Sequence, residues 1–327
     1  MKAIVNTAPG ELGWLDWALP VPGPQQVRIR TAVCGICATD LEMIAGWKRT
    51  GCPAIPGHEW SVVVDAVGAG VDRALLGRPC VADNVLSDGG EVGFEHAGGY
   101  GQFLITEAGN VRLLPDGFSM EQAALIEPLA VCVRAMRRLR PEPGESALVF
   151  GDGAIGLLML ALLKRAGVSA VTLVGGRGAR LAVAREFGAD PVVNYHEAGV
   201  ELGGALARSG GHPYANVIEA SGSPAALALA LDMAAREGKV LIVGDYGAGR
   251  ADFPWNHLLH RELALIGSNA SGGAWDEAVA LATGGEVPLG RLISHRLPAT
   301  EYARGLELLR HDRDVLKVLL DWRKGRP

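Results

Sequence analysis

The sequence predicts an α/β protein that combines a doubly wound parallel sheet with a β-rich module. A chain of 327 residues exceeds the usual size of one hydrophobic core, so two domains are expected. Residues 1–118 contain strand-like apolar runs broken by Pro and Gly clusters, which is typical of β-rich structure. Between residues 147 and 267, short apolar runs alternate with helical stretches, as in a parallel sheet with crossover helices.

The individual elements follow from the same patterns. The β-rich module has predicted strands at 26–33 and 61–67, followed by a mostly apolar helix over 120–140 that Pro128 kinks or restarts. The parallel sheet is predicted to contain the runs 147–150, 170–174, 191–194, 217–219, 239–244 and 263–267. The tail has helix-like patterns at 274–282 and 300–309 and a strand-like run at 316–320. We expect it to rejoin the first module, so the predicted domains are residues 1–128, residues 129–268 and a returning segment, residues 269–327.

Composition excludes several classes of function. A net charge of −5 without a long basic run argues against a nucleic-acid partner. No apolar stretch reaches the roughly 18 residues of a membrane helix, and the first residues lack a signal-peptide core, so we expect a soluble, cytoplasmic protein. Five scattered cysteines fit metal ligation and buried thiols better than a disulfide framework.

Two short motifs bring metal-ligand types together near the N-terminus. Cys37 lies in C-G-I-C-A-T-D, and His58 and Glu59 follow in P-G-H-E-W. A thiolate and an imidazole suit zinc, and two or three protein ligands leave a coordination position open for a substrate oxygen. The carboxylate ligand is either Glu59 or the later Glu127 in I-E-P-L-A. Each residue alone is more often a buried or hydrogen-bonded side chain, but the combination favours a catalytic zinc site.

Residues beside Cys37 have predicted supporting roles. The hydroxyl of Thr39 is expected to relay a proton between substrate and solvent, although a β-branched strand residue is nearly as good an interpretation. Asp40 is expected to orient the ligand imidazole, or alternatively to cap a helix that starts at Leu41. Cys34 lacks the second ligand pair of a zinc knuckle and is expected to pack in the core.

A glycine-rich turn between the run 147–150 and a helical pattern at 157–166 predicts a dinucleotide-binding site. The glycines permit a tight turn, and the helix N-terminus favours a pyrophosphate. The predicted contacts are Gly151, Gly153, Ala154, Ile155 and Gly156. The sequence gives no reason for Asp152, an anion inside this turn.

The end of the run 170–174 predicts the coenzyme. NAD-binding proteins place an acidic residue here for the ribose hydroxyls, but this chain has Gly175, Gly176 and Arg177. Loss of the carboxylate removes repulsion against a 2′-phosphate, and the arginine can pair with it. The sequence therefore favours NADP(H) over NAD(H), although a plain loop with a solvated arginine is the alternative.

These motifs together resemble the medium-chain dehydrogenase/reductase superfamily, in its zinc-dependent alcohol and polyol (sorbitol-like) dehydrogenase branch. The resemblance implies a GroES-like catalytic domain interrupted by a Rossmann domain, with an active-site cleft between them. The segment I-E-P-L-A-V is similar to one in sorbitol and sugar dehydrogenases, where the glutamate contacts zinc directly or through water. Relatives that prefer NADP have G-S-R and a later N-Y pair; Arg177 and Tyr195 match these features.

The chain also departs from the family pattern. Many relatives carry a four-cysteine structural zinc lobe, whereas residues 78–102 contain only Cys80, so one catalytic zinc and no structural zinc are expected. We expect a homo-oligomer, a dimer or a tetramer, but the shortened lobe puts in doubt any interface inferred from relatives. Arg134 stands where the polyol branch often has histidine, with no consequence that the sequence defines.

The predicted function is hydride transfer between NADP(H) and a secondary alcohol or ketone, with a polyol, sugar or other small hydroxylated molecule as substrate. A zinc-free quinone or enone reductase and a non-catalytic redox sensor that binds NADP(H) are the alternatives. Trp47, Trp60 and Phe94 are candidates either for the pocket wall or for the core.

Overall fold

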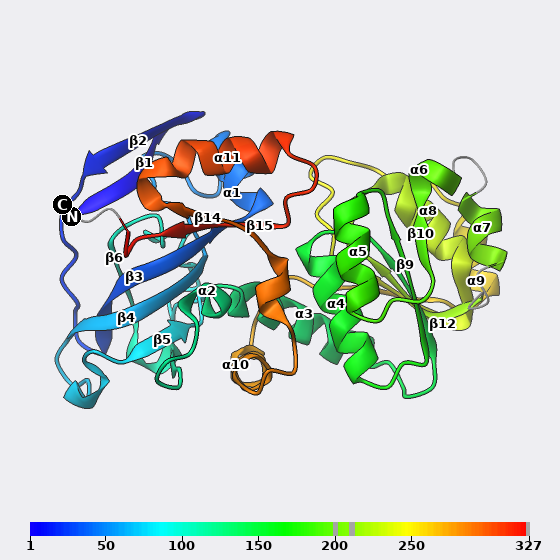
Figure 1. The fold of residues 1–327 in the computed structure, drawn as a ribbon, viewed down its shortest axis with the longest axis horizontal. Coiled ribbons are helices and arrows are strands. Elements are labelled where there is room, and N and C mark those ends of the chain that lie inside the picture. Colours follow the sequence, from blue (N-terminus) through cyan, green and yellow to red (C-terminus); the bar gives the residue numbers. More distant parts are fainter. Residues whose placement is uncertain (199–201, 209–212, 325–327) are drawn as a thin grey trace. The chain divides into compact units, whose positions relative to one another are not determined.

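A computed structural model describes residues 1–198, 202–208 and 213–324. The chain forms two compact units, shown as a ribbon in Figure 1: unit 1 comprises Met1–Ala130 and Gly272–Pro327, and unit 2 comprises Val131–Ser271. The C-terminal segment therefore belongs to the same unit as the N-terminal module. No helix among the described residues has the length and apolar character that crossing a bilayer requires.

Unit 1 is built on a seven-stranded sheet. Its order is β14-β15-β3-β4-β5-β7, and β6 also pairs with β3. The strands are β3 (Gln26–Ile36), β4 (Glu59–Val67), β5 (Pro79–Ala82), β6 (Phe103–Glu107), β7 (Val111–Leu113), β14 (Ile293–Pro298) and β15 (Lys317–Asp321). Strand β3 alternates buried and partly exposed residues in its first half, which pairs with β4 and β6, and is buried throughout its second half, which pairs with β4 and β15. A separate hairpin joins β1 (Lys2–Ala8) to β2 (Glu11–Asp16).

Short helices complete unit 1: α1 (Ala38–Ile44), α2 (Met120–Ala123), α10 (Trp275–Thr283) and α11 (Tyr302–His311). The single helix predicted over 120–140 is two helices, α2 and α3 (Ile126–Leu139). Pro128 lies in the first turn of α3, where its missing N–H has no helical acceptor, so the proline starts a helix rather than bending one. The core beneath the sheet includes Ile4, Trp60, Tyr100 and Leu320.

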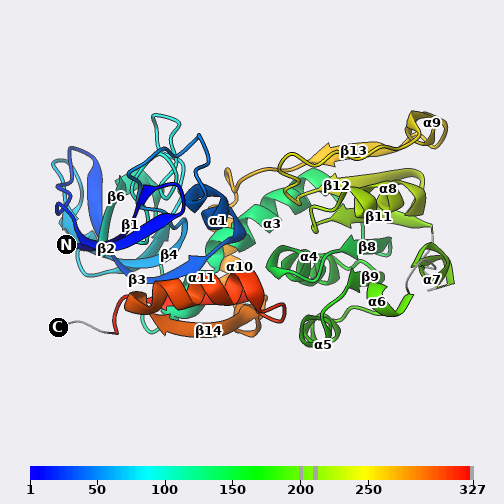
Figure 2. The same cartoon turned by 90° about the horizontal axis from the view of Figure 1, so that it is seen from above.

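Unit 2 is a parallel sheet of six strands in the order β10-β9-β8-β11-β12-β13, which confirms the predicted doubly wound sheet. The strands are β8 (Ser146–Phe150), β9 (Ala170–Gly175), β10 (Val192–Asn194), β11 (Tyr214–Glu219), β12 (Ala234–Ile242) and β13 (Ala264–Gly267). The helices are α4 (Ala154–Arg165), α5 (Gly178–Glu186), α6 (Tyr195–Ala198), α7 (Leu202–Arg208), α8 (Pro224–Met233) and α9 (Trp255–His260). Figures 1 and 2 show α4 and α5 on one face of this sheet and α7 and α8 on the other.

The strand order of unit 2 reverses between β8 and β11. From β8 the chain builds outward through β9 to β10, and then returns to pair β11 with the other side of β8. Nucleotides bind at the carboxyl ends of the strands at such a reversal. The glycine-rich turn that follows β8 lies at this position.

Candidate active site

Three strands bring the predicted metal ligands of unit 1 together. Cys37 directly follows β3, His58 directly precedes β4, and Glu59 is the first residue of β4. Because β3 and β4 are antiparallel with Gly35 opposite Glu59, the two motifs meet although about twenty residues separate them in the chain. Strand β15 pairs with the other side of β3, with Val318 opposite Ile36, and so brings Lys317 to the same place.

The chemistry of this donor set fits zinc. Ligand atoms of Cys37, His58 and Glu59 all lie within 4.8 Å of one another, and among the described residues they are the one set of three that does so. Oε2 of Glu59 is buried without a hydrogen-bond partner, which is unfavourable unless an ion or a water binds it. Glu127 is not part of this set.

Gly35 makes room for the carboxylate. A Cβ at this position would lie 2.5 Å from Oε2 of Glu59 and 3.2 Å from its Cβ. Any side chain on residue 35 would therefore push the carboxylate away from Cys37 and His58. The glycine of C-G-I-C, Gly35, therefore lets the side chain of Glu59 lie directly against β3.

Asp40 holds the imidazole of His58. Nδ1 of His58 lies 3.2 Å from Oδ1 of Asp40, at ion-pair distance although outside hydrogen-bond alignment, which leaves Nε2 for a metal. Oδ2 of Asp40 accepts hydrogen bonds from the backbone N–H of Cys37 (2.9 Å) and from the hydroxyl of Tyr100 (3.2 Å). Both interpretations of Asp40 therefore apply, except that the helix begins at Ala38 and not at Leu41.

Burial and neighbouring charges act in opposite directions on the groups of this site. Burial lowers the pKa of His58, but the charges of Asp40 and Cys37 outweigh it and hold that pKa well above its usual value. Burial raises the pKa of Glu127 to about 7, and the charge of His58 counteracts part of that rise. Glu127 therefore lies close enough to the cluster to sense its charge.

Lys317 is a site residue that the sequence analysis missed. Its ammonium group donates to Oε1 of Glu59, and the two side chains are 8% and 2% exposed. Burial alone would lower the pKa of Lys317, but the neighbouring negative charges, that of Glu59 above all, together outweigh this effect and hold that pKa above its usual value. The lysine therefore stays charged. A lysine inside the otherwise apolar run 316–320 was the signal available.

The remaining predicted residues of unit 1 are found close by or in the core. Oγ1 of Thr39 lies 3.7 Å from Sγ of Cys37. The ring of Phe94 lies 4.8 Å from that of His58, and Trp47 makes an edge contact with Phe94. Trp60, in contrast, is 2% exposed and belongs to the core.

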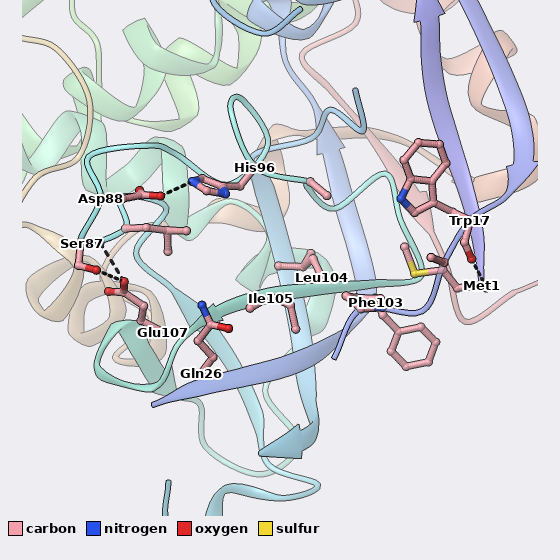
Figure 3. A pocket seen from close by; sticks show the side chains of 14 residues that line it. Met1, Trp17, Gln26, Ser87, Asp88, His96, Phe103, Leu104, Ile105 and Glu107 are labelled. Atoms are coloured by element: carbon pink, nitrogen blue, oxygen red, sulfur yellow. Dashed lines mark hydrogen bonds and ion pairs between the residues drawn. The ribbon is translucent and has the colours of Figure 1, made fainter. Parts of the chain in front are cut away.

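A hollow of about 270 Å³ in unit 1 is lined by residues of β6 and of segments that precede it in the chain (Figure 3). Figure 3 shows His96 paired with Asp88, at 2.9 Å, and Ser87 hydrogen-bonded to Glu107. The polar groups at this hollow thus bind one another. We assign it no role.

In unit 2 the glycine-rich turn has the geometry of a phosphate cradle. Gly151 has φ +118°, and a Cβ on Gly156 would lie 2.0 Å from the carbonyl oxygen of Gly151, so both positions require glycine. A Cβ on Gly153 would meet open space at the N-terminus of α4, which begins at Ala154 and continues through Ile155. The turn fits a dinucleotide pyrophosphate.

A cavity of about 590 Å³ beside this turn includes the end of β9. Gly175, Arg177 and Tyr195 line it together with Asp152 and Arg180. The guanidinium of Arg177 donates to the hydroxyl of Tyr195 at 3.3 Å. A Cβ on Gly176 would lie 2.4 Å from the ring of Tyr195, so the glycine allows the ring to cover the turn.

Comparison with known proteins identifies the family. The family model for the alcohol dehydrogenase GroES-like domain matches residues 23–116, and the model for zinc-binding dehydrogenases matches residues 154–284. The chain is also 30% identical to the L-threonine 3-dehydrogenase of Rhizobium etli over 98% of its own length and 99% of that protein. The chain belongs to the zinc-dependent medium-chain dehydrogenase superfamily.

This membership confirms the resemblance and the predicted fold of GroES-like and Rossmann domains. The chain is an oxidoreductase of the alcohol and polyol dehydrogenase type. The D-arabitol-phosphate dehydrogenase of Enterococcus avium is 27% identical to it over 98% of this chain and 97% of that protein. Among solved structures, a short chain alcohol dehydrogenase of Escherichia coli CFT073 with NADH bound is 25% identical in sequence to this chain. The two structures superpose with a TM-score of 0.92 over 98% of this chain and 99% of that chain.

Proposed function

We propose that this protein is a zinc-dependent NADP(H) oxidoreductase that interconverts a secondary alcohol and its ketone. The observation that carries the proposal is the set of Cys37, which is half-buried, with the buried His58 and Glu59, whose ligand atoms lie within 4.8 Å of one another. A zinc-free quinone or enone reductase has no need of such a set, and a purely structural zinc site is normally closed by four protein ligands.

In this proposal Cys37, His58 and Glu59 hold one zinc ion, and Glu127 is the alternative carboxylate. A zinc ion bound there supplies a Lewis acid that polarises the substrate oxygen. Asp40 keeps the imidazole of His58 in position through Nδ1.

The other residues near Cys37 act on the substrate. Thr39 lies close enough to Cys37 to move the hydroxyl proton of the substrate towards solvent. Phe94 and Trp47 form an aromatic wall beside His58. A small hydroxylated molecule such as a polyol or sugar is the proposed substrate, and the similarity to the D-arabitol-phosphate dehydrogenase supports this choice.

The coenzyme is proposed to bind in unit 2 and to accept or donate the hydride. Backbone N–H groups of Gly153, Ala154 and Ile155, at the start of α4, would bind the pyrophosphate. Arg177, held by Tyr195, would pair with the 2′-phosphate of NADP(H).

The experiment that tests the proposal combines metal analysis with turnover. Purified protein is expected to contain one zinc per chain and to oxidise at least one member of a panel of polyols, sugars and polyol phosphates with NADP⁺. Cys37→Ser should lose both the zinc and at least about 100-fold of kcat/KM, since the Lewis acid goes with the metal. Cys52→Ser, at an exposed free cysteine, should keep both. Full activity in Cys37→Ser, or coenzyme binding without turnover of any substrate, would contradict the proposal.

A second measurement addresses the coenzyme. Arg177→Ala is expected to lower kcat/KM for NADP⁺ by about tenfold or more and to leave that for NAD⁺ nearly unchanged, because only NADP⁺ carries the 2′-phosphate. Arg185→Ala, at an exposed position on α5, the helix that Arg177 caps, is the control for removing a positive charge. Equal losses for both coenzymes would rule out the phosphate contact.

A further inference from the structure

Asp152 is an anion inside a turn that is shaped to hold a pyrophosphate, yet its side chain points elsewhere. A single oxygen, Oδ2, accepts hydrogen bonds from the backbone N–H of Gly176 (2.8 Å) and of Arg177 (2.9 Å). The other oxygen, Oδ1, lies 3.5 Å from the guanidinium of Arg180. The carboxylate thus reaches from the first turn of the Rossmann domain to the end of the second strand, β9.

Its charge is compensated at that position. Arg177 is the N-cap of α5, so Oδ2 of Asp152 lies against the N–H groups at the helix N-terminus, where a negative charge is favourable. Arg180, in the first turn of the same helix, adds a positive charge. The side chains of Asp152 and Arg180 are 12% and 20% exposed, so both contacts are largely shielded from water.

Gly175 is what admits the carboxylate. A Cβ on Gly175 would lie 2.5 Å from Cβ of Asp152, 2.6 Å from Oδ2 and 2.7 Å from Leu181. An acidic residue at 175, the position that binds ribose hydroxyls in many NAD proteins, is therefore incompatible with Asp152 as it stands. The carboxylate at the end of β9 comes from residue 152 instead, and one of its oxygens, Oδ2, already accepts hydrogen bonds from the backbone of residues 176 and 177.

We propose that Asp152 is a positioning residue for the adenosine end of the coenzyme: through Oδ2 it fixes the turn 175–177, and with Oδ1 it holds Arg180 beside Arg177, so that two guanidinium groups converge on a 2′-phosphate. This inference rests on the proposed binding of NADP(H). The side chain itself touches neither ribose nor phosphate. Arg180 becomes a second cation of the site, which the sequence pattern did not reveal.

Two variants distinguish the role of Oδ2 of Asp152 from that of Oδ1. Asp152→Asn keeps one oxygen that can accept both backbone N–H groups, whereas Asp152→Ala removes every acceptor. The probes are adenosine 2′,5′-bisphosphate and 5′-AMP, with binding measured by calorimetry on the full chain. Neither probe reports on zinc or turnover, so the result does not depend on the metal site or on the unidentified substrate.

The wild type should bind the bisphosphate at least about tenfold tighter than 5′-AMP, since a paired phosphate contact is worth that much. Asp152→Asn should lower that ratio only in part, because the turn persists while the ion pair with Arg180 is lost, and Asp152→Ala should lose most of it. Arg180→Ala should also lower the ratio, and Arg185→Ala should not.

Three outcomes would overturn the inference. If the wild type itself shows no preference for the bisphosphate, both the NADP(H) proposal and this inference fail. If the wild type prefers it and Asp152→Ala keeps the full ratio while remaining folded by circular dichroism, only the role of Asp152 fails. If Asp152→Asn selectively loses 5′-AMP affinity, the carboxylate contacts the ribose directly and is not a positioning residue.

Discussion

Lys317 forms a buried ion pair with Glu59, although the two residues lie 258 positions apart in the chain. The lysine is the first residue of β15 and the glutamate the first of β4, and both strands border β3. The ion pair ties the C-terminal segment to the metal-ligand cluster. Lys317 pairs with one carboxylate oxygen, Oε1, while the other, Oε2, is buried without a hydrogen-bond partner.

Lys317→Met is predicted to destabilise the zinc-free protein by about 3–5 kcal/mol, because it leaves the charge of Glu59 buried without its partner. Chemical denaturation in the presence of a chelator measures this. The double variant Glu59→Gln/Lys317→Met should recover much of the loss, since no unpaired charge remains. Lys2→Met, which removes an ion pair with Asp16 at exposures of 42% and 83%, should change stability far less. Equal effects of Lys317→Met and Lys2→Met would refute the buried ion pair.

Gly35→Ala is predicted to weaken zinc binding by at least about tenfold, a loss typical of changes that displace a metal ligand. The added methyl group would stand 2.5 Å from Oε2 of Glu59 and force the carboxylate away. Competition with a chromogenic chelator gives the affinity. Gly109→Ala, where a Cβ would meet nothing within 4 Å, is the matched control. Unchanged zinc affinity in Gly35→Ala would show that Glu59 is not a ligand in this position.

The sequence was informative where the chemistry is local. Cys37 and His58 stand in short motifs, and the strand pattern predicted β3 and β4, although their pairing, which joins the two motifs, is seen only in the structure. Lys317 was out of reach because its partner depends on how the last strand enters the sheet. Apolar periodicity predicts that strand but not its neighbour.

Side-chain direction was the second limit. Asp152 had no explanation from the sequence because its position in the glycine-rich turn suggests contact with a pyrophosphate. Its actual direction depends on the missing Cβ of Gly175, which lies on another strand. The start of α1 at Ala38 was missed for a related reason. An N-cap residue at position 40 would place the first helical residue at Leu41, but Asp40 is the third residue of the helix, and its carboxylate accepts a hydrogen bond from the backbone N–H of Cys37, the N-cap.

Gly175→Asp is predicted to destabilise the protein in the wild-type background, because the new side chain would overlap Asp152. In an Asp152→Gly background, which removes both Cβ and the carboxylate of residue 152, the new side chain at 175 would meet only the end of the Leu181 side chain, which can move aside. We expect the double variant to shift the ratio of kcat/KM for NAD⁺ over NADP⁺ towards NAD⁺ by about tenfold or more, since a carboxylate there accepts from the ribose hydroxyls and repels a 2′-phosphate. An unchanged ratio in a folded double variant would contradict the placement of the adenosine end.

Acid stability should depend on Arg323. Burial would raise the pKa of Asp321, but the hydrogen bonds and charge of Arg323 outweigh it and lower that pKa; Glu121 is affected in the same way. A carboxyl whose folded pKa is lowered contributes stability above its unfolded pKa of about 4, and loses that contribution as the pH falls through the folded pKa.

Arg323→Met is therefore predicted to lower the free energy of unfolding by up to about 1 kcal/mol at pH 7, with the difference from wild type disappearing below about pH 3. Urea denaturation at a series of pH values measures this. Arg310→Met, which removes a more exposed pair with Glu307, should have a smaller effect. A difference that persists at pH 2 would show that Arg323 stabilises the chain through packing instead.

The most direct test of the account is anomalous diffraction at the zinc absorption edge from crystals of the full chain. We predict one anomalous peak in unit 1, about 2.3 Å from Sγ of Cys37 and about 2.1 Å from Nε2 of His58. A crystal grown with zinc that shows no peak between these two atoms, or shows their side chains turned apart, would contradict the account.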